Sequence, residues 1–238
     1  MLSRFIGKVA IVTGSSSGIG REAAIGFAKE GACVVVHGQN AEELKNTESM
    51  MLEADCCKFG KIDVLVNNAG AASKPRETAT SKLIADSLDN FDYLFHLNVR
   101  SAVEMTLLAL PYLEKTKGNI INVGSVGSTK TFPTSTFYSC TKAALDHFTR
   151  NYADKLGVQG IRVNSLNPGS IKTNVVARHN LRNGQEKFEQ FAAGHTSLGR
   201  IGEVSEVAPI LLFLASEQAS YVTGATWVVD GGMLVRAL

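Results

Sequence analysis

The stretch Thr13-Gly14-Ser15-Ser16-Ser17-Gly18-Ile19-Gly20 decides the fold of this chain. It follows a β-branched run at residues 8–12, a predicted strand, and opens a segment at residues 18–30 whose apolar positions recur at helical spacing. A glycine-rich turn between a strand and a helix is typical of a unit that binds a dinucleotide. The spacing is G-x-x-x-G-x-G rather than the commoner G-x-G-x-x-G, so the alternative is a plain Gly/Ser turn in an α/β protein.

Each glycine of this turn suits a phosphate-binding loop. Gly14 can form the tight turn, Gly18 lets the backbone approach a pyrophosphate, and Gly20 lets the helix pack closely on the strand. The N–H groups and the dipole at the helix N-terminus favour a dianion there. We therefore predict a cofactor-binding turn made of Gly14, Ser16, Ser17, Gly18, Ile19 and Gly20.

Beyond the turn, short β-branched runs alternate with longer segments of helical period. This alternation predicts a parallel sheet covered by helices on both faces, an α/β doubly wound fold of the Rossmann type. The predicted strands are residues 8–12, 32–36, 63–66, 119–123, 161–166 and 226–229, and the main helices are residues 18–30, 88–113 and 137–156. Because no repeat or linker interrupts the pattern, we expect residues 1–238 to form a single dinucleotide-binding catalytic domain.

The bulk composition excludes several kinds of partner. A formal net charge of +2 gives no electrostatic reason to expect a nucleic acid or a membrane surface. No apolar run reaches the roughly 18 residues that a membrane span needs. The histidines show no metal-ligand spacing, so we predict no metal site.

Cysteine usage bears on location. Cys33, Cys56, Cys57 and Cys140 form no CxxC pair and no evident disulfide framework. We interpret them as reduced thiols, and the N-terminus does not have the pattern of a secretory signal. The sequence therefore predicts a cytoplasmic protein.

Tyr138 and Lys142 are spaced i and i+4, so they share one face of a predicted helix. A free tyrosine has a pKa of about 10, and a cation in contact lowers it by about 1–3 units. A tyrosine tuned in this way can exchange a proton with a carbonyl oxygen. Ser125 follows the strand at residues 119–123, at the sheet edge where ligands bind, so its hydroxyl could bond the same oxygen. The pair alone is more often a solvated helix face, and Ser125 together with the glycine turn favours the catalytic interpretation.

As a set, the motifs resemble the short-chain dehydrogenase/reductase family over nearly the whole chain. The motifs that carry the resemblance are Thr13–Gly20, Asn67-Asn68-Ala69-Gly70, Asn98, Ser125, Tyr138, Lys142, Asn167-Pro168-Gly169, Tyr221-Val222-Thr223-Gly224 and Asp230-Gly231-Gly232. The resemblance implies an NAD(P)-dependent oxidoreductase that transfers hydride between a nicotinamide dinucleotide and a small-molecule carbonyl or alcohol. It also implies a homotetramer or homodimer, and a substrate lid at about residues 174–200.

The resemblance implies a role for each site residue. Tyr138 would be the general acid/base, Lys142 would bind the nicotinamide ribose and lower the tyrosine pKa, and Ser125 would polarise the substrate oxygen. Asn98 would anchor a water-mediated proton relay to Lys142. The remaining expected cofactor contacts are Asn68, Ala69 and Gly70 on the adenosine side, and Pro168, Gly169, Ile171 and Thr173 around the nicotinamide. A helix-kinking polar residue at Asn98 and a helix cap at Thr173 are the structural alternatives.

The chain departs from the family between the second and third predicted strands. Only residues 37–62 lie there, where the family places a helix, a strand and a second helix. Two crossovers of at least about 10–12 residues and a strand of about 5–6 leave no room for turns. We predict one helix at residues 41–59 and no strand beyond the second; the alternative keeps a stub strand at residues 51–55, with Asp55 beside the adenine. Right-handed crossover places the 41–59 helix on the sheet face opposite the 18–30 helix.

Residues His37-Gly38-Gln39-Asn40 end the second strand. An acidic residue there would bind a ribose 2′-hydroxyl, and a basic one nearby a 2′-phosphate. With neither present, we expect a slight preference for NADP(H) over NAD(H), with Gln39 and Asn40 as donors. Because the missing strand removes one wall of the adenine pocket, we also expect weakened cofactor affinity. The alternative function is a catalytically weak or inactive variant that acts as a binding or regulatory subunit.

Overall fold

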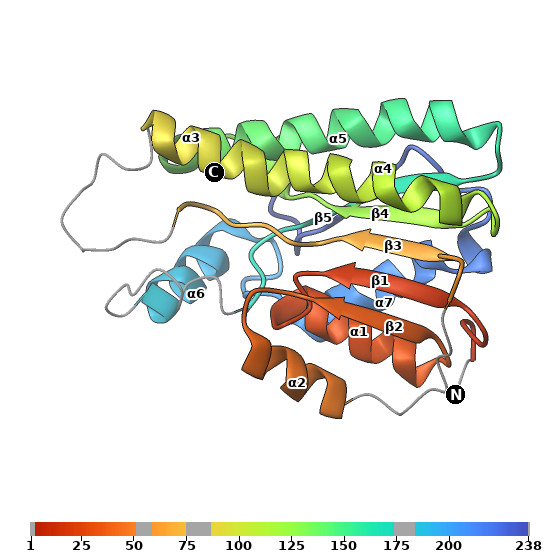
Figure 1. The fold of residues 1–238 in the computed structure, drawn as a ribbon. Helices are drawn as coiled ribbons and strands as arrows, with labels where there is room; N and C mark the ends of the chain where they lie inside the picture. The colour runs from red at the N-terminus through yellow and green to blue at the C-terminus, as the bar shows by residue number, and fades with distance from the viewer. Residues whose placement is uncertain (1–2, 51–58, 75–86, 174–183, 238) are drawn as a thin grey trace.

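Six parallel strands form one sheet in the computed structural model, which describes residues 3–50, 59–74, 87–173 and 184–237 (Figure 1). The strand order is β2-β1-β3-β4-β5-β6, so the chain winds outward in both directions from β1 and β3. The strands are β1 Val9–Thr13, β2 Cys33–His37, β3 Val64–Asn67, β4 Asn119–Val123, β5 Arg162–Pro168 and β6 Thr226–Val229. This is the predicted doubly wound Rossmann-type sheet, and each predicted strand is present within two residues of its expected bounds.

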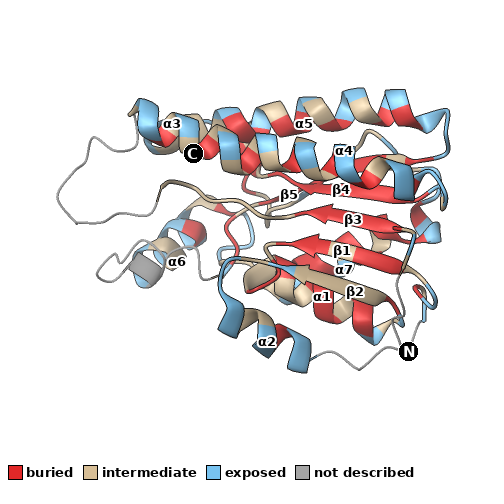
Figure 2. Cartoon of the chain, viewed as in Figure 1, coloured by how far each residue is buried: buried red, intermediate tan, exposed pale blue. Residues whose placement is uncertain are grey.

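Helices cover both faces of the sheet. Helices α1 (Gly18–Lys29) and α7 (Val204–Ala215) pack together on one face, and α4 (Ser101–Leu113) and α5 (Thr136–Gly157) lie on the other (Figure 1). Alternate residues of each central strand supply the two cores, because side chains of a strand point to opposite faces. In β3, Val64 and Val66 join the core beneath α1 and α7, whereas Leu65 joins the core beneath α4 and α5. Figure 2 shows β1, β3 and β4 buried.

The long helix predicted at residues 88–113 is present with an irregularity. Helix α3 (Leu88–Phe95) continues through a π-helical turn at His96–Arg100 into α4. Single π-helical turns inside helices occur frequently at functional sites. The buried residue of this turn is Asn98, one of the expected site residues. Helix α6 (Gly184–His195) falls within the segment expected to form the lid, while α7 has no counterpart among the elements predicted above.

Strand β2 ends the sheet on its side in the described part of the chain. It pairs with β1 from Val9↔Cys33 to Thr13↔His37, and its residues are half-buried apart from His37, which is exposed. The predicted loss of a further strand therefore agrees with the residues that the structure describes. The alternative stub strand at residues 51–55 lies outside them, as does the second half of the helix predicted at residues 41–59.

The expected position of that helix is wrong. Helix α2 (Ala41–Ser49) packs against α1 and β2 at the sheet edge, not on the face opposite α1 (Figure 1). The reason is that the described turns of α2 are polar, with Thr47 as their one buried residue. A helix without an apolar stripe cannot cover a sheet face, so it lies where its polar side chains meet partners on α1.

The cysteine interpretation also needs correction. Cys33, in β2, is disulfide-bonded, and its partner lies outside the described residues. Cys140 is free and exposed. Sequence spacing could not show the bond, because a disulfide depends on which residues folding brings together. The cytoplasmic location stays a prediction without this support. Among the described residues, no helix is long and apolar enough to cross a membrane.

Candidate active site

The glycine turn lies at the carboxyl end of β1, where α1 begins. Gly14 and Gly18 have φ values of 67° and 60°, a left-handed conformation that glycine adopts without strain. No acidic side chain lies in the first turn of α1. The helix N-terminus is therefore suited to a phosphate dianion, and the backbone fits a dinucleotide at this position.

The loop after β3 holds the glycine turn in place. The Thr13 hydroxyl accepts hydrogen bonds from the backbone N–H groups of Asn68 and Ala69, at 3.0 and 3.1 Å. In return, Asn68 Nδ2 donates to the carbonyl oxygens of Thr13 and Gly14, at 2.9 and 3.1 Å. A Cβ atom on Gly20 would lie 2.5 Å from Gly14 O, which explains why this position of α1 needs glycine.

The same loop reaches the catalytic candidates through Gly70. A Cβ atom on Gly70 would lie 3.1 Å from Asn98 Oδ1 and 3.6 Å from Lys142 Nζ. Asn98 is 2% exposed. Its Oδ1 accepts a hydrogen bond from the backbone N–H of Ala71, and its Nδ2 donates to the Ala71 carbonyl oxygen, both at 2.9 Å. Asn98 Nδ2 also donates to Thr141 Oγ1 at 3.0 Å. Asn98 thus joins the loop after β3 to the helix that carries Tyr138, and its expected water relay stays a prediction.

Ser125, Tyr138 and Lys142 come together at the carboxyl end of β4. The Ser125 hydroxyl lies close enough to the Tyr138 hydroxyl to favour its ionised form. Lys142 is 5% exposed, its Nζ lies 5.7 Å from the centre of the Tyr138 ring, and it donates to Val123 O at 2.8 Å. The structure therefore assembles the three residues that sequence analysis singled out.

The pKa values of this group depart from the simplest expectation. Burial raises the pKa of Tyr138, and the nearby Ser125 hydroxyl opposes that effect only in part. The residue as a whole is half-buried. Burial also lowers the pKa of Lys142 to about 8, against the attraction of Asp146. The structure therefore does not show the predicted lowering of the tyrosine pKa, because desolvation of the phenolate is the largest influence on it.

The segment after β5 closes the site from the other side. Pro168 pairs with Val229 of β6, and a Cβ atom on Gly169 would lie 2.8 Å from Asp230 Cα. Ile171 is buried and forms an isolated bridge with Gly202. Thr173 meets the glycine turn, since its Cγ2 would lie 3.3 Å from a Cβ atom on Gly18. All four expected residues are thus at the same edge of the sheet.

The adenine side is less complete. Gln39 is exposed, and Asn40 Oδ1 caps α2 by accepting from Glu43 N at 3.0 Å. Gly38 lies against the glycine turn, because its Cβ would be 3.0 Å from Ser16 Oγ. The Gly38 contact brings the end of β2 beside Ser16, and the roles of Gln39 and Asn40 stay predictions.

Two groups near the site were missed by sequence reasoning. Arg21 of α1 bonds Ser16 O, the Glu43 carboxylate and Thr47 Oγ1, so it ties α2 to the glycine turn. Asp146 of α5 is buried and bonds Ser165 and Asn167 of β5. Only Asp146 had a sequence signal, since it follows Lys142 by one helical turn, as Lys142 follows Tyr138.

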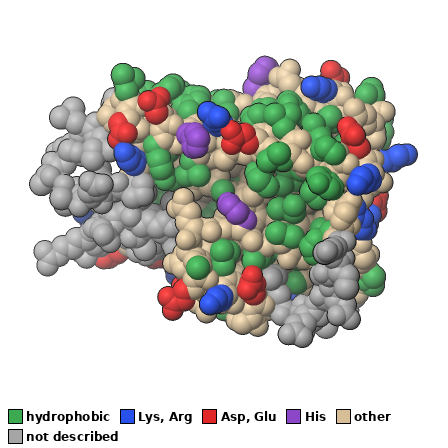
Figure 3. All heavy atoms as spheres, viewed as in Figure 1, with side chains coloured by type: hydrophobic (Ala, Val, Ile, Leu, Met, Phe, Trp, Pro, Cys, Tyr) green, Lys and Arg blue, Asp and Glu red, His purple; other side chains and the backbone are tan. Residues whose placement is uncertain are grey.

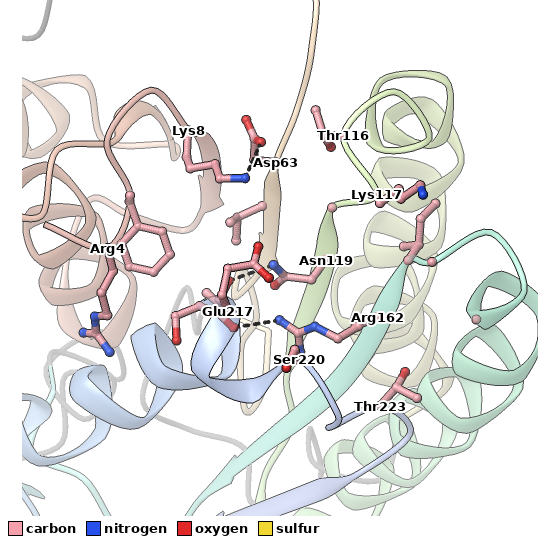
Figure 4. A pocket seen from close by; sticks show the side chains of 18 residues that line it. Arg4, Lys8, Asp63, Thr116, Lys117, Asn119, Arg162, Glu217, Ser220 and Thr223 are labelled. Carbon is pink, nitrogen blue, oxygen red and sulfur yellow. Dashed lines mark hydrogen bonds and ion pairs between the residues drawn. The ribbon is translucent and has the colours of Figure 1, made fainter.

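A cavity of about 500 Å³ opens at the opposite, amino-terminal edge of the sheet (Figure 4). Lys8, Asp63 and Asn119 line it, at the starts of β1, β3 and β4. Two of its charges are paired with each other, since Asp63 contacts Lys8 at 3.3 Å; Asp63 also contacts Lys61 at 3.2 Å. None of the catalytic candidates lines this cavity, so it is separate from the site described above.

The fold and the site define a dinucleotide-binding oxidoreductase of the Rossmann type. Two family profiles match the chain, "short chain dehydrogenase" over residues 8–56 and "Enoyl-(Acyl carrier protein) reductase", a short-chain dehydrogenase profile, over residues 50–234. The chain therefore belongs to the short-chain dehydrogenase/reductase family and is an NAD(P)-dependent enzyme acting on small molecules. The two matches meet at residues 50–56, inside the shortened segment.

Individual relatives agree with this assignment. The chain is 33% identical to the 3-oxoacyl-(acyl-carrier-protein) reductase of Thermotoga maritima, over 98% of this chain and 100% of that protein. It is also 33% identical to a 7alpha-hydroxysteroid dehydrogenase of Bacteroides fragilis, over 99% and 97% of the two chains. The first alignment spans 256 positions against 238 residues, so this chain carries gaps relative to that enzyme.

Solved structures give the same family. A short-chain dehydrogenase/reductase of Caenorhabditis elegans, determined with cofactor, is 36% identical with a TM-score of 0.88, covering 98% and 97% of the two chains. The L-sorbose reductase of Gluconobacter frateurii, in complex with NADPH and L-sorbose, is 30% identical with a TM-score of 0.84 over 100% of both chains.

Proposed function

We propose that the protein transfers hydride between a nicotinamide dinucleotide and a carbonyl or alcohol, with Tyr138 as the acid/base. The observation that carries this proposal is the placing of Ser125 and Tyr138 together at the carboxyl end of β4, with the buried Lys142 one helical turn from the tyrosine and its Nζ 5.7 Å from the ring centre. Two hydroxyl groups that meet can both reach one substrate oxygen. That arrangement suits the reduction of a carbonyl group, in which the carbon accepts a hydride and the oxygen accepts a proton.

The bound dinucleotide would supply or accept the hydride, and the residues of this chain handle the proton. In the reducing direction, Tyr138 donates its phenolic proton to the substrate oxygen while Ser125 donates a hydrogen bond to the same atom. The raised pKa of Tyr138 keeps the phenol protonated at neutral pH, so it is ready as an acid. Lys142 stabilises the phenolate that remains, because opposite charges in a buried site interact strongly.

We assign the cofactor contacts as the sequence resemblance implies them. The glycine turn would bind the pyrophosphate, Asn68–Gly70 would line the adenosine side, and Pro168–Thr173 would enclose the nicotinamide. Asn98 would support the proton path beside Lys142. The whole chain would act as one catalytic domain, with the segment around α6 as the lid; in Figure 1 that helix lies beyond the carboxyl ends of the strands.

We further propose a preference for NADP(H). No carboxylate ends β2 to repel a 2′-phosphate, and the exposed amides of Gln39 and Asn40 follow Gly38, which packs on Ser16 of the glycine turn. The similar L-sorbose reductase was solved with NADPH, which agrees with this choice. A tighter measured affinity for NADH than for NADPH would contradict it.

A direct test combines both proposals. Fluorescence titration of the purified protein with NADPH and NADH gives the two affinities. Cofactor oxidation is then followed with a 3-oxoacyl thioester, a keto steroid and a keto sugar, the substrate kinds that the relatives' names suggest. We expect turnover of at least one ketone with the tighter cofactor. Binding of neither cofactor at millimolar concentration would favour the inactive, regulatory alternative instead.

A further inference from the structure

A buried carboxylate lies behind the catalytic candidates. Asp146 is 5% exposed and sits on α5 one turn after Lys142. Its Oδ1 accepts from Ser165 Oγ at 2.7 Å, and its Oδ2 accepts from Asn167 Nδ2 at 2.8 Å. The Ser165 hydroxyl also lies 2.7 Å from Asn167 Oδ1, so its single proton is shared between the side chains of Asp146 and Asn167.

Asp146 and Lys142 are spaced i and i+4 on α5, so they lie on the same face of this helix. Lys142 is also buried, and burial alone disfavours an ammonium group. Among the described residues, Asp146 is the group whose attraction opposes this effect on Lys142. The other elements packed around the ammonium present neutral groups: Val123 O from β4, the Tyr138 ring from α5, and the loop at Gly70.

The same carboxylate supports the loop that carries Ser125. Asn167, held by Asp146, donates from Nδ2 to Ser128 Oγ at 3.0 Å. Gly124 packs directly on the Asn167 amide, where a Cβ atom would overlap Asn167 Oδ1. A continuous chain of contacts thus runs from Asp146 to both sides of Ser125.

We propose that Asp146 is a positioning residue for the reaction: its carboxylate keeps Lys142 in the ammonium form and, through Asn167, holds the Ser125 loop in place. This inference rests on the proposed roles of Tyr138 and Lys142. It adds a group that touches neither substrate nor cofactor and acts through its neighbours.

The test is the pH profile of kcat/KM for the reduced cofactor in Asp146→Asn. Loss of the carboxylate should lower the pKa of Lys142 from about 8 by about one unit. The alkaline limb of the profile should then move down by about one pH unit, because the ammonium form is lost at lower pH. With that shift, the rate falls about threefold at pH 7.5 and stays near the parent value at pH 6.

Ser165→Ala is the matched control. It removes one bond of the same network and leaves the charge, so it should lower thermal stability without moving the alkaline limb. If Asp146→Asn does not accumulate as folded protein, Asp146→Ser carries the same expectation, since its hydroxyl is neutral and can accept from Asn167.

Two results separate the possible failures. An alkaline limb that stays in place in Asp146→Asn or Asp146→Ser, while Tyr138→Phe is inactive, would overturn the role of Asp146 alone. A Tyr138→Phe variant that keeps the parent rate would overturn the proposed chemistry, whatever Asp146 does. A limb that moves equally in Ser165→Ala would also refute the inference, because the charge would then not be its cause.

Discussion

Lys142 Nζ donates a hydrogen bond to the carbonyl oxygen of Val123, 2.8 Å away. The bond joins the second turn of α5 to the last residue of β4, two residues before Ser125. The relative position of the catalytic helix and the serine loop is therefore held by protein atoms before any cofactor binds. This pre-organisation is what an acid/base site requires, since misplacement of about 1 Å can cost about a hundredfold in rate.

Replacement of Tyr138 by phenylalanine should remove turnover and leave the fold intact. The substitution deletes the transferable proton and keeps the ring, and positioned acid/base groups contribute about 10²–10⁴-fold. We expect kcat to fall by at least about a hundredfold, with the same melting temperature and cofactor affinity within about twofold. Tyr152→Phe on the same helix, where the ring packs on Phe148, is the control and should keep full activity.

Lys142→Met should impair both turnover and cofactor binding, and its effect on stability should depend on pH. In the folded protein, burial lowers the pKa of Lys142 from 10.5 to about 8. Below about pH 8 the lysine is charged in the folded and the unfolded state, and burial of the charge destabilises the fold. Between about pH 8 and 10.5 only the unfolded state keeps the proton, so the free energy of unfolding rises with pH.

Urea unfolding of the parent and of Lys142→Met at several pH values measures this effect. The stability of the parent relative to the variant should increase between about pH 8 and 10.5, and then level off. A difference that stays constant over this range would show that Lys142 has an ordinary pKa.

Gly20→Ala should damage the glycine turn. The added Cβ would lie 2.5 Å from the backbone oxygen of Gly14, so α1 or the turn must move. We expect a loss of about 1–3 kcal/mol in the free energy of unfolding and weaker dinucleotide binding. Gly157→Ala is the matched control, because that helical glycine has open space around its Cβ position and the substitution should stabilise by about 0.5–1 kcal/mol.

Glu43→Gln should weaken the attachment of α2 to the glycine turn. Glu43 is bound by Arg21, which also bonds the Ser16 carbonyl. The pair is partly exposed, so the effect should be modest, with a KM for the cofactor raised about two- to fivefold and kcat unchanged. Glu104→Gln, which breaks the exposed Arg100–Glu104 pair on α4, should change neither constant.

The family resemblance predicts a homodimer or homotetramer formed through α4, α5 and the C-terminal strand region. Figure 3 shows hydrophobic side chains gathered on the face that carries α4, where Leu107, Leu108 and Tyr112 are 50%, 71% and 42% exposed. Burial of such a patch stabilises association. Light scattering at micromolar concentration should give a molar mass of at least a dimer, and Leu108→Glu should lower that mass toward the monomer value. A monomeric parent protein would refute the prediction.

Features that depend on residue type and local spacing were predictable from the sequence. The strands were located because β-branched runs alternate with helical periods, and β4 and β6 have the predicted bounds. The glycine turn was predictable because a left-handed backbone at Gly14 and Gly18 requires residues without a side chain. The i, i+4 pair of Tyr138 and Lys142 likewise follows from helix geometry alone.

Features that depend on burial and on distant contacts were decided only by the tertiary structure. The direction of the Tyr138 pKa shift depends on how far folding desolvates its hydroxyl. The position of α2 depends on Arg21, which belongs to another helix, α1. The partners of Asp146 come from β5, about twenty residues away in the chain. A sequence records which side chains can donate, accept or carry charge, whereas the energy of those groups depends on the neighbours and the solvent exposure that folding provides.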